Sequence, residues 1–170
     1  MAPNFVPDDL APPVLERGAP PLVGCAPSFG GRMTAPPDTE VAVQRVLDRI
    51  QTAWREGRPE EMAPALSPDI TFVFPGFSMR LTGRDRLIDS YRDFLAGTRL
   101  RSYREDRRSI EGGTSAAMAE ISFDMTYARA GGAWRAHGVE LWALERRADG
   151  WVAFWRTMQE LTEEPVQEPA

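Results

Sequence analysis

Apolar and polar residues alternate along the last third of the chain with the two-residue period of β-strands. This alternation predicts three strands, at residues 117–128, 134–145 and 151–161. The pairs Gly131-Gly132 and Asp149-Gly150 separate the strands, and such pairs favour tight hairpins. We therefore expect consecutive antiparallel strands at the end of the fold.

Helical spacing precedes these strands, because apolar residues recur every three or four positions at Val43, Val46, Leu47, Ile50 and Trp54. We expect a helix from an N-cap at Thr39 to Arg55. Further patterns predict a short helix at 59–66, a strand at 69–74, a helix at 84–95 and a strand at 100–110. This order predicts an α+β domain, in which the helices pack on the concave face of a curved, mostly antiparallel sheet, a cone-shaped half-barrel.

Proline content divides the chain, since nine of the 15 prolines lie in residues 1–38. Proline interrupts helices and central strands, so we expect this segment to be mostly disordered. Residues 39–161 form the expected domain, and residues 162–170 read as an acidic tail. An alternative is that the protein starts at Met33, because the residues after it make an ordinary short leader to a helix.

Composition excludes several classes of function. The net charge of −5 argues against a nucleic-acid partner. With one His and one Cys, the chain offers neither a two-histidine metal site nor a Cys/His cluster, and we expect no metal and no cofactor. Apolar runs are too short to span a bilayer, and the N-terminus lacks the pattern of a secretory signal, so we expect no membrane partner and a cytoplasmic location.

Glu140 is the candidate catalytic residue, because it is a lone acid in a strand that is apolar on both faces. Strand parity places it on one face with Gly138, Trp142 and Leu144. A carboxylate on an inward row must be paired, protonated or functional. Glu140 therefore indicates either a cavity that contains one acid or a structural ion pair with an arginine such as Arg156 or Arg101.

Several motifs resemble the SnoaL-like, ketosteroid-isomerase-like branch of the nuclear transport factor 2 superfamily. They are Phe74-Pro75-Gly76-Phe77, Thr82-Gly83-Arg84-Asp85 opening a helix with Tyr91-Arg92-Asp93-Phe94, the run Gly138–Arg147, and Trp155-Arg156-Thr157. The resemblance covers about residues 39–161 and implies the fold described above. It does not imply one activity, because the superfamily includes isomerases, cyclases, hydrolases, dehydratases and non-enzymatic modules.

The resemblance can be tested against the ketosteroid isomerase site. Glu140 stands at a position similar to that of the protonated Asp of those enzymes, whereas Phe74 replaces their general base. The position of their helical Tyr corresponds to about Ile50. Steroid isomerisation by that mechanism is therefore not expected. The chain also has only His137, whereas scytalone-type dehydratases need paired histidines.

If the resemblance sets the strand register without a gap, an aromatic pocket surrounds Glu140. Its expected substrate-binding residues are Phe74, Phe123, Tyr127, Trp142, Trp155 and Gln159. Such a lining suits a small apolar molecule. A shift of one residue in any strand would exchange the two faces of that strand.

Two functions from different classes remain open, and the sequence does not decide whether the protein is an enzyme. The first is an isomerase, cyclase or hydrolase that acts on a small apolar molecule, with Glu140 as acid or base, because desolvation among aromatic rings disfavours a charged carboxylate. The second is a non-catalytic binding or assembly module. We also expect a homodimer through the outer sheet face, which would carry His137, Val139, Leu141, Val152, Phe154, Arg156 and Met158.

Overall fold

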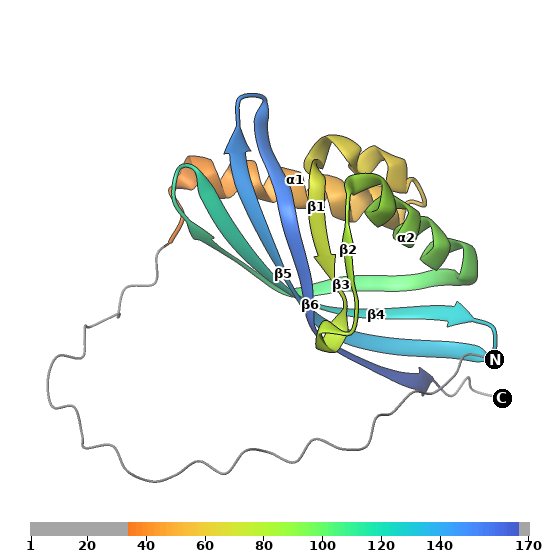
Figure 1. Cartoon of the computed structure of the whole chain (residues 1–170). Coiled ribbons are helices and arrows are strands. Elements are labelled where there is room, and N and C mark those ends of the chain that lie inside the picture. The colour runs from red at the N-terminus through yellow and green to blue at the C-terminus, as the bar shows by residue number, and fades with distance from the viewer. Residues whose placement is uncertain (1–33, 167–170) are drawn as a thin grey trace, which may run out of the picture. The chain divides into compact units, whose positions relative to one another are not determined.

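Three helical segments and a six-stranded sheet make up the part of the chain that the computed structural model describes, residues 34–166 (Figure 1). The helical segments are α1 (Pro37–Arg55), the 3-10 helix η1 (Pro59–Ala65) and α2 (Arg84–Gly97), with a single turn η2 (Pro75–Phe77). The strands are β1 (Leu66–Val73), β2 (Arg80–Thr82), β3 (Thr98–Gly112), β4 (Ala116–Arg129), β5 (Gly132–Arg147) and β6 (Gly150–Val166). The expected disorder of residues 1–33 and the alternative start at Met33 lie outside the described residues.

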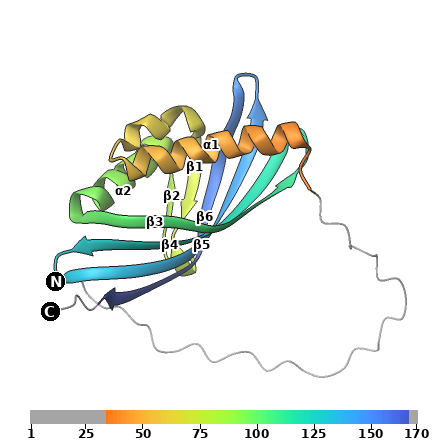
Figure 2. The same cartoon turned by 180° about the vertical axis from the view of Figure 1, so that it is seen from behind.

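The sheet has the order β2-β1-β6-β5-β4-β3, so β3 to β6 form a meander of three hairpins. All neighbouring strands are antiparallel except β1 and β6, which are parallel. Hairpins occur at Gly131-Gly132 and Asp149-Gly150, as the sequence predicted, and Gly131, Gly132 and Gly150 have positive φ angles there. The sheet is curved and unclosed, and the two views show the helices on its concave face (Figures 1 and 2). The expected α+β class is confirmed.

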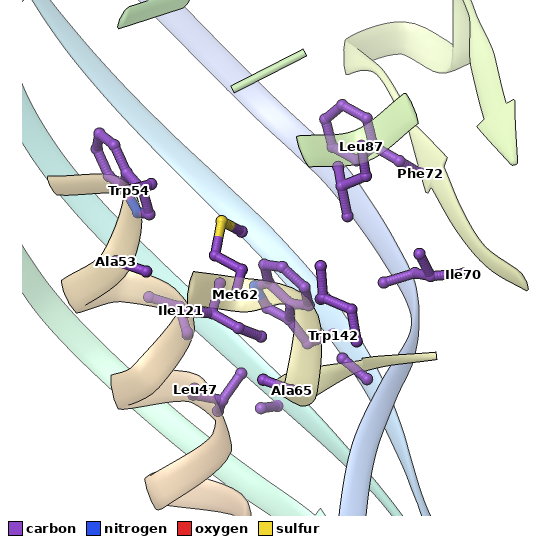
Figure 3. Close-up of a cluster of buried hydrophobic side chains, with 14 of the residues drawn as sticks. Leu47, Ala53, Trp54, Met62, Ala65, Ile70, Phe72, Leu87, Ile121 and Trp142 are labelled. Carbon is purple, nitrogen blue, oxygen red and sulfur yellow. The ribbon is translucent and has the colours of Figure 1, made fainter. Parts of the chain in front are cut away.

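The core lies between the helices and the concave face of the sheet. The apolar stripe of α1 is buried there, and its residues Leu47 and Ile50 are each 1% exposed. Figure 3 shows a single cluster of buried side chains from three sources: Leu47 and Trp54 of α1, Met62 of η1, and Ile121 and Trp142 of the sheet. α2 adds Leu87 and Ile88. The apolar faces of the helices and of the sheet thus pack together in one hydrophobic layer.

Both ends of the domain reach further than expected. α1 begins at Pro37 rather than after an N-cap at Thr39, because proline fits the first helical turn and Asp38 and Glu40 complement the helix dipole there. Thr34 bridges to Glu111 ahead of the helix. At the other end β6 pairs with β5 up to Val166, so residues 162–166 are strand rather than an acidic tail, and residues 167–170 lie outside the described part.

Strand β2 is an element that the sequence did not predict. It has only three residues, and it pairs with β1 through contacts such as Phe72 with Leu81. Three residues are too few to show an alternating pattern. The loop between β1 and β2 nevertheless contributes Phe74 and Pro75 to the wall of the cavity described below.

Candidate functional site

A cavity of about 320 Å³ lies between the helices and the concave face of the sheet. Its wall is mostly aromatic and apolar, and both helices, η2, β1, β3, β4, β5 and β6 contribute to it. The residues of the wall are Gln51, Trp54, Phe72, Phe74, Pro75, Ser90, Tyr91, Phe94, Thr98, Tyr103, Phe123, Met125, Tyr127, Arg129, Glu140, Arg156, Met158, Leu161 and Glu163. This volume is at the lower end of the range for small-molecule sites.

Glu140 and Arg156 form a buried ion pair on this wall. The guanidinium Nε of Arg156 donates to Oε2 of Glu140 at 2.7 Å, and its Nη2 lies 2.5 Å from the same oxygen. The other carboxylate oxygen, Oε1, accepts a hydrogen bond from Nε2 of Gln51 at 3.1 Å. The exposed fractions are 2% for Glu140 and 6% for Arg156. Both oxygens of this buried carboxylate are therefore held by donors.

A hydrogen-bond chain fixes the position of Gln51. The indole Nε1 of Trp54 donates to Oε1 of Gln51 at 2.9 Å, and Gln51 in turn donates to Glu140. Because Gln51 and Trp54 are three residues apart, they lie on the same face of α1. The side chain of Gln51 therefore reaches from α1 to the sheet, and both its amide nitrogen and its amide oxygen have a hydrogen-bond partner.

Arg156 is surrounded by aromatic rings as well as by the carboxylate. Its Cζ lies 4.5 Å from the ring centre of Phe72, 5.3 Å from that of Trp142 and 5.8 Å from that of Tyr91. Burial is the largest single influence and lowers the pKa of Arg156, but the charge and hydrogen bond of Glu140, together with Tyr91 and Tyr103, raise that pKa above its ordinary value. The pair therefore consists of a stable cation and its counter-ion, and its net charge is zero.

Two tyrosines bring hydroxyl groups to the cavity. Burial raises the pKa of Tyr91 to about 12. The positive charge of Arg156 lowers this pKa and the negative charge of Glu140 raises it. Burial and the charge of Glu140 also raise the pKa of Tyr103 far above its ordinary value. Both hydroxyls stay protonated at neutral pH. The hydroxyl of Tyr103 is buried and has no hydrogen-bond partner among residues 34–166.

A second group of charges lies at the ends of β4 and β6, where the cavity wall includes Tyr127, Arg129 and Glu163. The Tyr127 hydroxyl donates to Glu163, and Arg129 Nη2 lies 3.7 Å from the same carboxylate. Burial and this hydrogen bond raise the pKa of Tyr127 to about 12. Here again one positive and one negative side chain balance each other.

Strand β6 departs from the expected register at two bulges, and this changes the site. Ala143 pairs with Trp155 but Leu144 pairs with Ala153, so Phe154 is an extra residue. Likewise Glu140 pairs with Met158 but Val139 with Glu160, so Gln159 is a second extra residue. Each extra residue shifts the alternation by one position.

Because of these bulges, the pocket prediction was wrong for two residues of β6. Trp155 and Gln159 do not line the cavity, whereas Arg156 and Met158 do. Trp155 pairs with Ala143 on the convex face, where its indole donates to Oγ1 of Thr157 at 2.7 Å and the guanidinium of Arg80 lies 4.8 Å from its ring centre. Arg156 was expected on the outer face, but it lies on the cavity wall beside Glu140.

The structure places the remaining site candidates on the expected inner face. Glu140, Phe74, Phe123 and Tyr127 line the cavity, and Trp142 is completely buried in the core beside Arg156 without reaching the wall. Sequence reasoning missed the contributions of Gln51, Trp54, Tyr91 and Tyr103. One signal was available for Gln51, because it is a polar residue beside the apolar stripe of α1, four positions after Leu47.

Other kinds of site receive no support from the described residues. Residues 34–166 contain no group of three or more His, Cys, Asp or Glu side chains that could hold a metal ion. Within the same range, neither α1 nor α2 combines the length and the apolar character needed to cross a bilayer.

Comparisons with known proteins agree with this architecture. The model of the SnoaL-like domain family matches residues 43–155. No curated protein matches the chain. Several solved structures share the fold at low sequence identity, and three of them are described next.

A ketosteroid isomerase-like protein from Erwinia carotovora atroseptica SCRI1043 has a TM-score of 0.59 and 16% identity, over 70% of this chain and 93% of its own. A candidate scytalone dehydratase from Novosphingobium aromaticivorans DSM 12444 has a TM-score of 0.65 and 14% identity, over 78% of this chain and 91% of its own. A candidate calcium/calmodulin-dependent kinase II association domain from Exiguobacterium sibiricum 255-15 has a TM-score of 0.61 and 15% identity, over 86% of this chain and 100% of its own. At these identities the similarity extends to the fold and not to the activity.

Proposed function

We propose that this chain, which belongs to the SnoaL-like domain family, binds a small, largely apolar organic molecule in the cavity between its helices and its sheet. The observation that carries the proposal is the composition of the wall: mostly aromatic and apolar side chains, with a few fixed polar groups that include the buried Glu140–Arg156 pair. Apolar walls with a few fixed polar groups are the usual make-up of small-molecule sites.

The buried ion pair supports a binding role over a purely structural one. Replacing a buried ion pair with well-packed apolar residues is often neutral or stabilising, so the pair contributes little to stability in its own right. Glu140 and Arg156 also face a cavity rather than closed core. Charged groups that are held in place and face a cavity are typical of functional sites.

Proton transfer is a second function that the same site favours, and it would make the protein an isomerase, cyclase or hydrolase. The observation in its favour is that Glu140 belongs to the cavity wall, so a ligand can contact it. Arg156 and Gln51 hold the carboxylate in a fixed position on the wall, and general acid–base catalysis requires a positioned side chain. Glu140→Gln would then abolish turnover while the ligand still binds.

Binding in the cavity can be tested with N-phenyl-1-naphthylamine, a neutral apolar probe whose fluorescence rises in apolar surroundings. We expect wild-type protein to bind the probe and Met158→Trp to weaken binding at least about tenfold, because the larger side chain fills the cavity. Met118→Trp is the matched control, since Met118 is 49% exposed and is absent from the cavity wall. Circular dichroism would verify that each variant is folded, and Leu161→Trp offers a second way to fill the cavity.

Equal binding by wild-type protein and by both cavity-filling variants would contradict the proposal, because the probe would then occupy another surface. Absence of binding to wild-type protein would contradict it as well. Loss of binding in Met118→Trp alone would indicate the convex face of the sheet as the binding surface.

A non-catalytic dimeric binding or assembly module is the alternative function. The convex face of the sheet supports it, because Phe154 is 37% exposed, Met118 is also exposed, and Ala143 of β5 lies between their strands. Val139 and Leu141 are half-buried further along β5. Met158 and Arg156, which were expected on this face, point into the cavity instead, so the apolar surface is smaller than predicted. The kinase association domain with the same fold is, by its name, a protein that associates.

We expect the chain to sediment as a dimer at micromolar concentration, since a two-fold contact would cover the apolar convex face of both copies. Phe154→Glu would place a charge on that face, and the variant should sediment as a monomer. Glu60→Gln, on the opposite side at η1, is a control that should remain dimeric. A wild-type monomer at this concentration would refute the dimer.

A further inference from the structure

We infer that Gly138 determines the size of the ligand that the cavity admits, because the absence of a side chain there lets the ring of Phe123 lie back against the sheet. The inference rests on the proposed function, since it concerns the same cavity, and it adds the size of the ligand to that function. Three observations support it: the pairing of Gly138 with Phe123, the space that a side chain at position 138 would occupy, and the ring on which Phe123 stacks.

Gly138 and Phe123 stand directly opposite each other on the neighbouring strands β5 and β4. Both belong to the inward rows of their strands, and both are buried. Opposite residues on one face of a sheet have β-carbons only about 5 Å apart, so their side chains compete for the same space. Glycine leaves all of that space to the aromatic ring.

A methyl group at position 138 would collide with this ring. Its carbon would lie 2.5 Å from Cζ and 2.8 Å from Cε1 of Phe123, well inside the separation of about 3.5–4.0 Å at which carbon atoms pack. The backbone oxygen of Glu160 on β6 would lie 3.1 Å from the same carbon, and a strand backbone yields less readily than the end of a side chain. The Phe123 ring is therefore the group that would move.

The ring can move only away from the sheet, which is the direction of the cavity. Phe123 is 3% exposed and lines the cavity. It stacks on Tyr103, with ring centres 5.6 Å apart and planes 24° apart. Tyr103 in turn meets the ring of Trp54 edge-on at 5.4 Å, so it has little room to retreat. A ring lifted from β5 would therefore take up space that is now part of the cavity.

The space over Gly138 adjoins the ion pair on the cavity wall. Glu140 follows Gly138 by two residues on the same face of β5, which places the two positions about 7 Å apart along the strand. The cavity volume of about 320 Å³ is at the lower end for small-molecule sites, so the displacement of one aromatic ring matters in proportion. A ligand with an additional ring would lose its place before a more compact one.

Two fluorescent probes that differ by one phenyl ring test the inference: N-phenyl-1-naphthylamine and 1-aminonaphthalene. We expect Gly138→Ala to weaken binding of the larger probe about tenfold and binding of the smaller probe less than about twofold, because only the larger one needs the space that the displaced ring would fill. Gly113→Ala is the matched control, since a β-carbon there would meet no atom within 4 Å and Gly113 is absent from the cavity wall. It should keep the wild-type ratio of the two affinities.

A second substitution tests whether Phe123 transmits the effect. Phe123→Leu shortens the side chain that the methyl group would meet. We therefore expect Gly138→Ala/Phe123→Leu to bind the two probes in the same ratio as Phe123→Leu alone. A loss of stability alone would not change this ratio, because both probes bind the same folded protein. Circular dichroism would verify that each variant is folded.

The outcomes separate the inference from the proposed function. If neither probe binds wild-type protein, the proposed function is wrong and the inference falls with it. If both probes bind but Gly138→Ala leaves their ratio unchanged, or changes it equally in the Phe123→Leu background, the cavity binds ligands and the inference alone is overturned. Should Gly138→Ala fail to fold, Phe123→Leu decides: it should shift the ratio at least about threefold in favour of the larger probe, and an unchanged ratio would overturn the inference.

Discussion

Replacing Arg156 with methionine is expected to reduce the free energy of unfolding by about 3–5 kcal/mol, because it leaves the carboxylate of Glu140 buried without its counter-ion. Gln51 would still donate to one oxygen, but an amide supplies no charge. Urea denaturation monitored by fluorescence measures the change.

Two variants test whether the loss comes from the unpaired charge. The double variant Glu140→Gln/Arg156→Met removes both charges and should recover most of the lost stability. Arg135→Met is the control for an exposed pair, since Arg135 bonds to Asp124 on the surface and its loss should cost only about 0–1 kcal/mol. A loss below about 1 kcal/mol for Arg156→Met would mean that solvent or another cation reaches Glu140.

Trp142→Ala is expected to be comparably destabilising, by about 3–5 kcal/mol, because Trp142 is completely buried and its removal leaves a large void. The ring also lies 5.3 Å from the guanidinium of Arg156, so the ion pair would lose part of its support. Denaturation with urea again gives the change in stability.

Trp142→Phe separates packing from hydrogen bonding at this position. The indole N–H of Trp142 has no partner within residues 34–166, so its removal sacrifices no hydrogen bond. Phenylalanine keeps most of the apolar volume, and we expect a loss of only about 1–2 kcal/mol. Equal losses in the alanine and phenylalanine variants would show that the indole N–H does form a bond that stabilises the fold.

Local periodicity was sufficient to predict most of the fold. On β4 the inward row Ile121, Phe123, Met125 and Tyr127 is buried, and on β5 Glu140 and Trp142 share the inner face, as alternation predicted. These two strands pair without a shift over their whole length, so residue parity translates directly into position in space. Glu140 could therefore be placed on the inner face from the sequence.

The same argument from alternation fails on strand β6. Its bulges fall at Phe154 and Gln159, and neither residue type marks a bulge in the way that glycine can. The register implied by the resemblance, taken without a gap, therefore assigned Trp155 to the cavity and Arg156 to the outer face, the reverse of their positions in the structure. The ion pair of Glu140 with Arg156, one of the two alternatives that the sequence left open, is confirmed, but the pocket prediction had placed Arg156 on the opposite face of β6.

Contacts between distant parts of the chain set the second limit. Gln51 and Glu140 are 89 residues apart in sequence, and their hydrogen bond depends on how α1 crosses the sheet. Tyr103 lies between Arg101 and Arg104 in the sequence, yet its side chain packs against Trp54 and Phe123. No single-sequence pattern contains the crossing angle or the curvature that brings these groups together.

The most direct test of ligand binding in the cavity is a titration of 15N-labelled protein with 2-acetylnaphthalene, followed through the indole N–H resonances of its five tryptophans. Trp54 lines the cavity and donates to Gln51, whereas Trp155 lies on the convex face. Binding in the cavity predicts that the Trp54 resonance shifts with saturation while the Trp155 resonance stays in place. A shift of Trp155 with an unchanged Trp54 would contradict it.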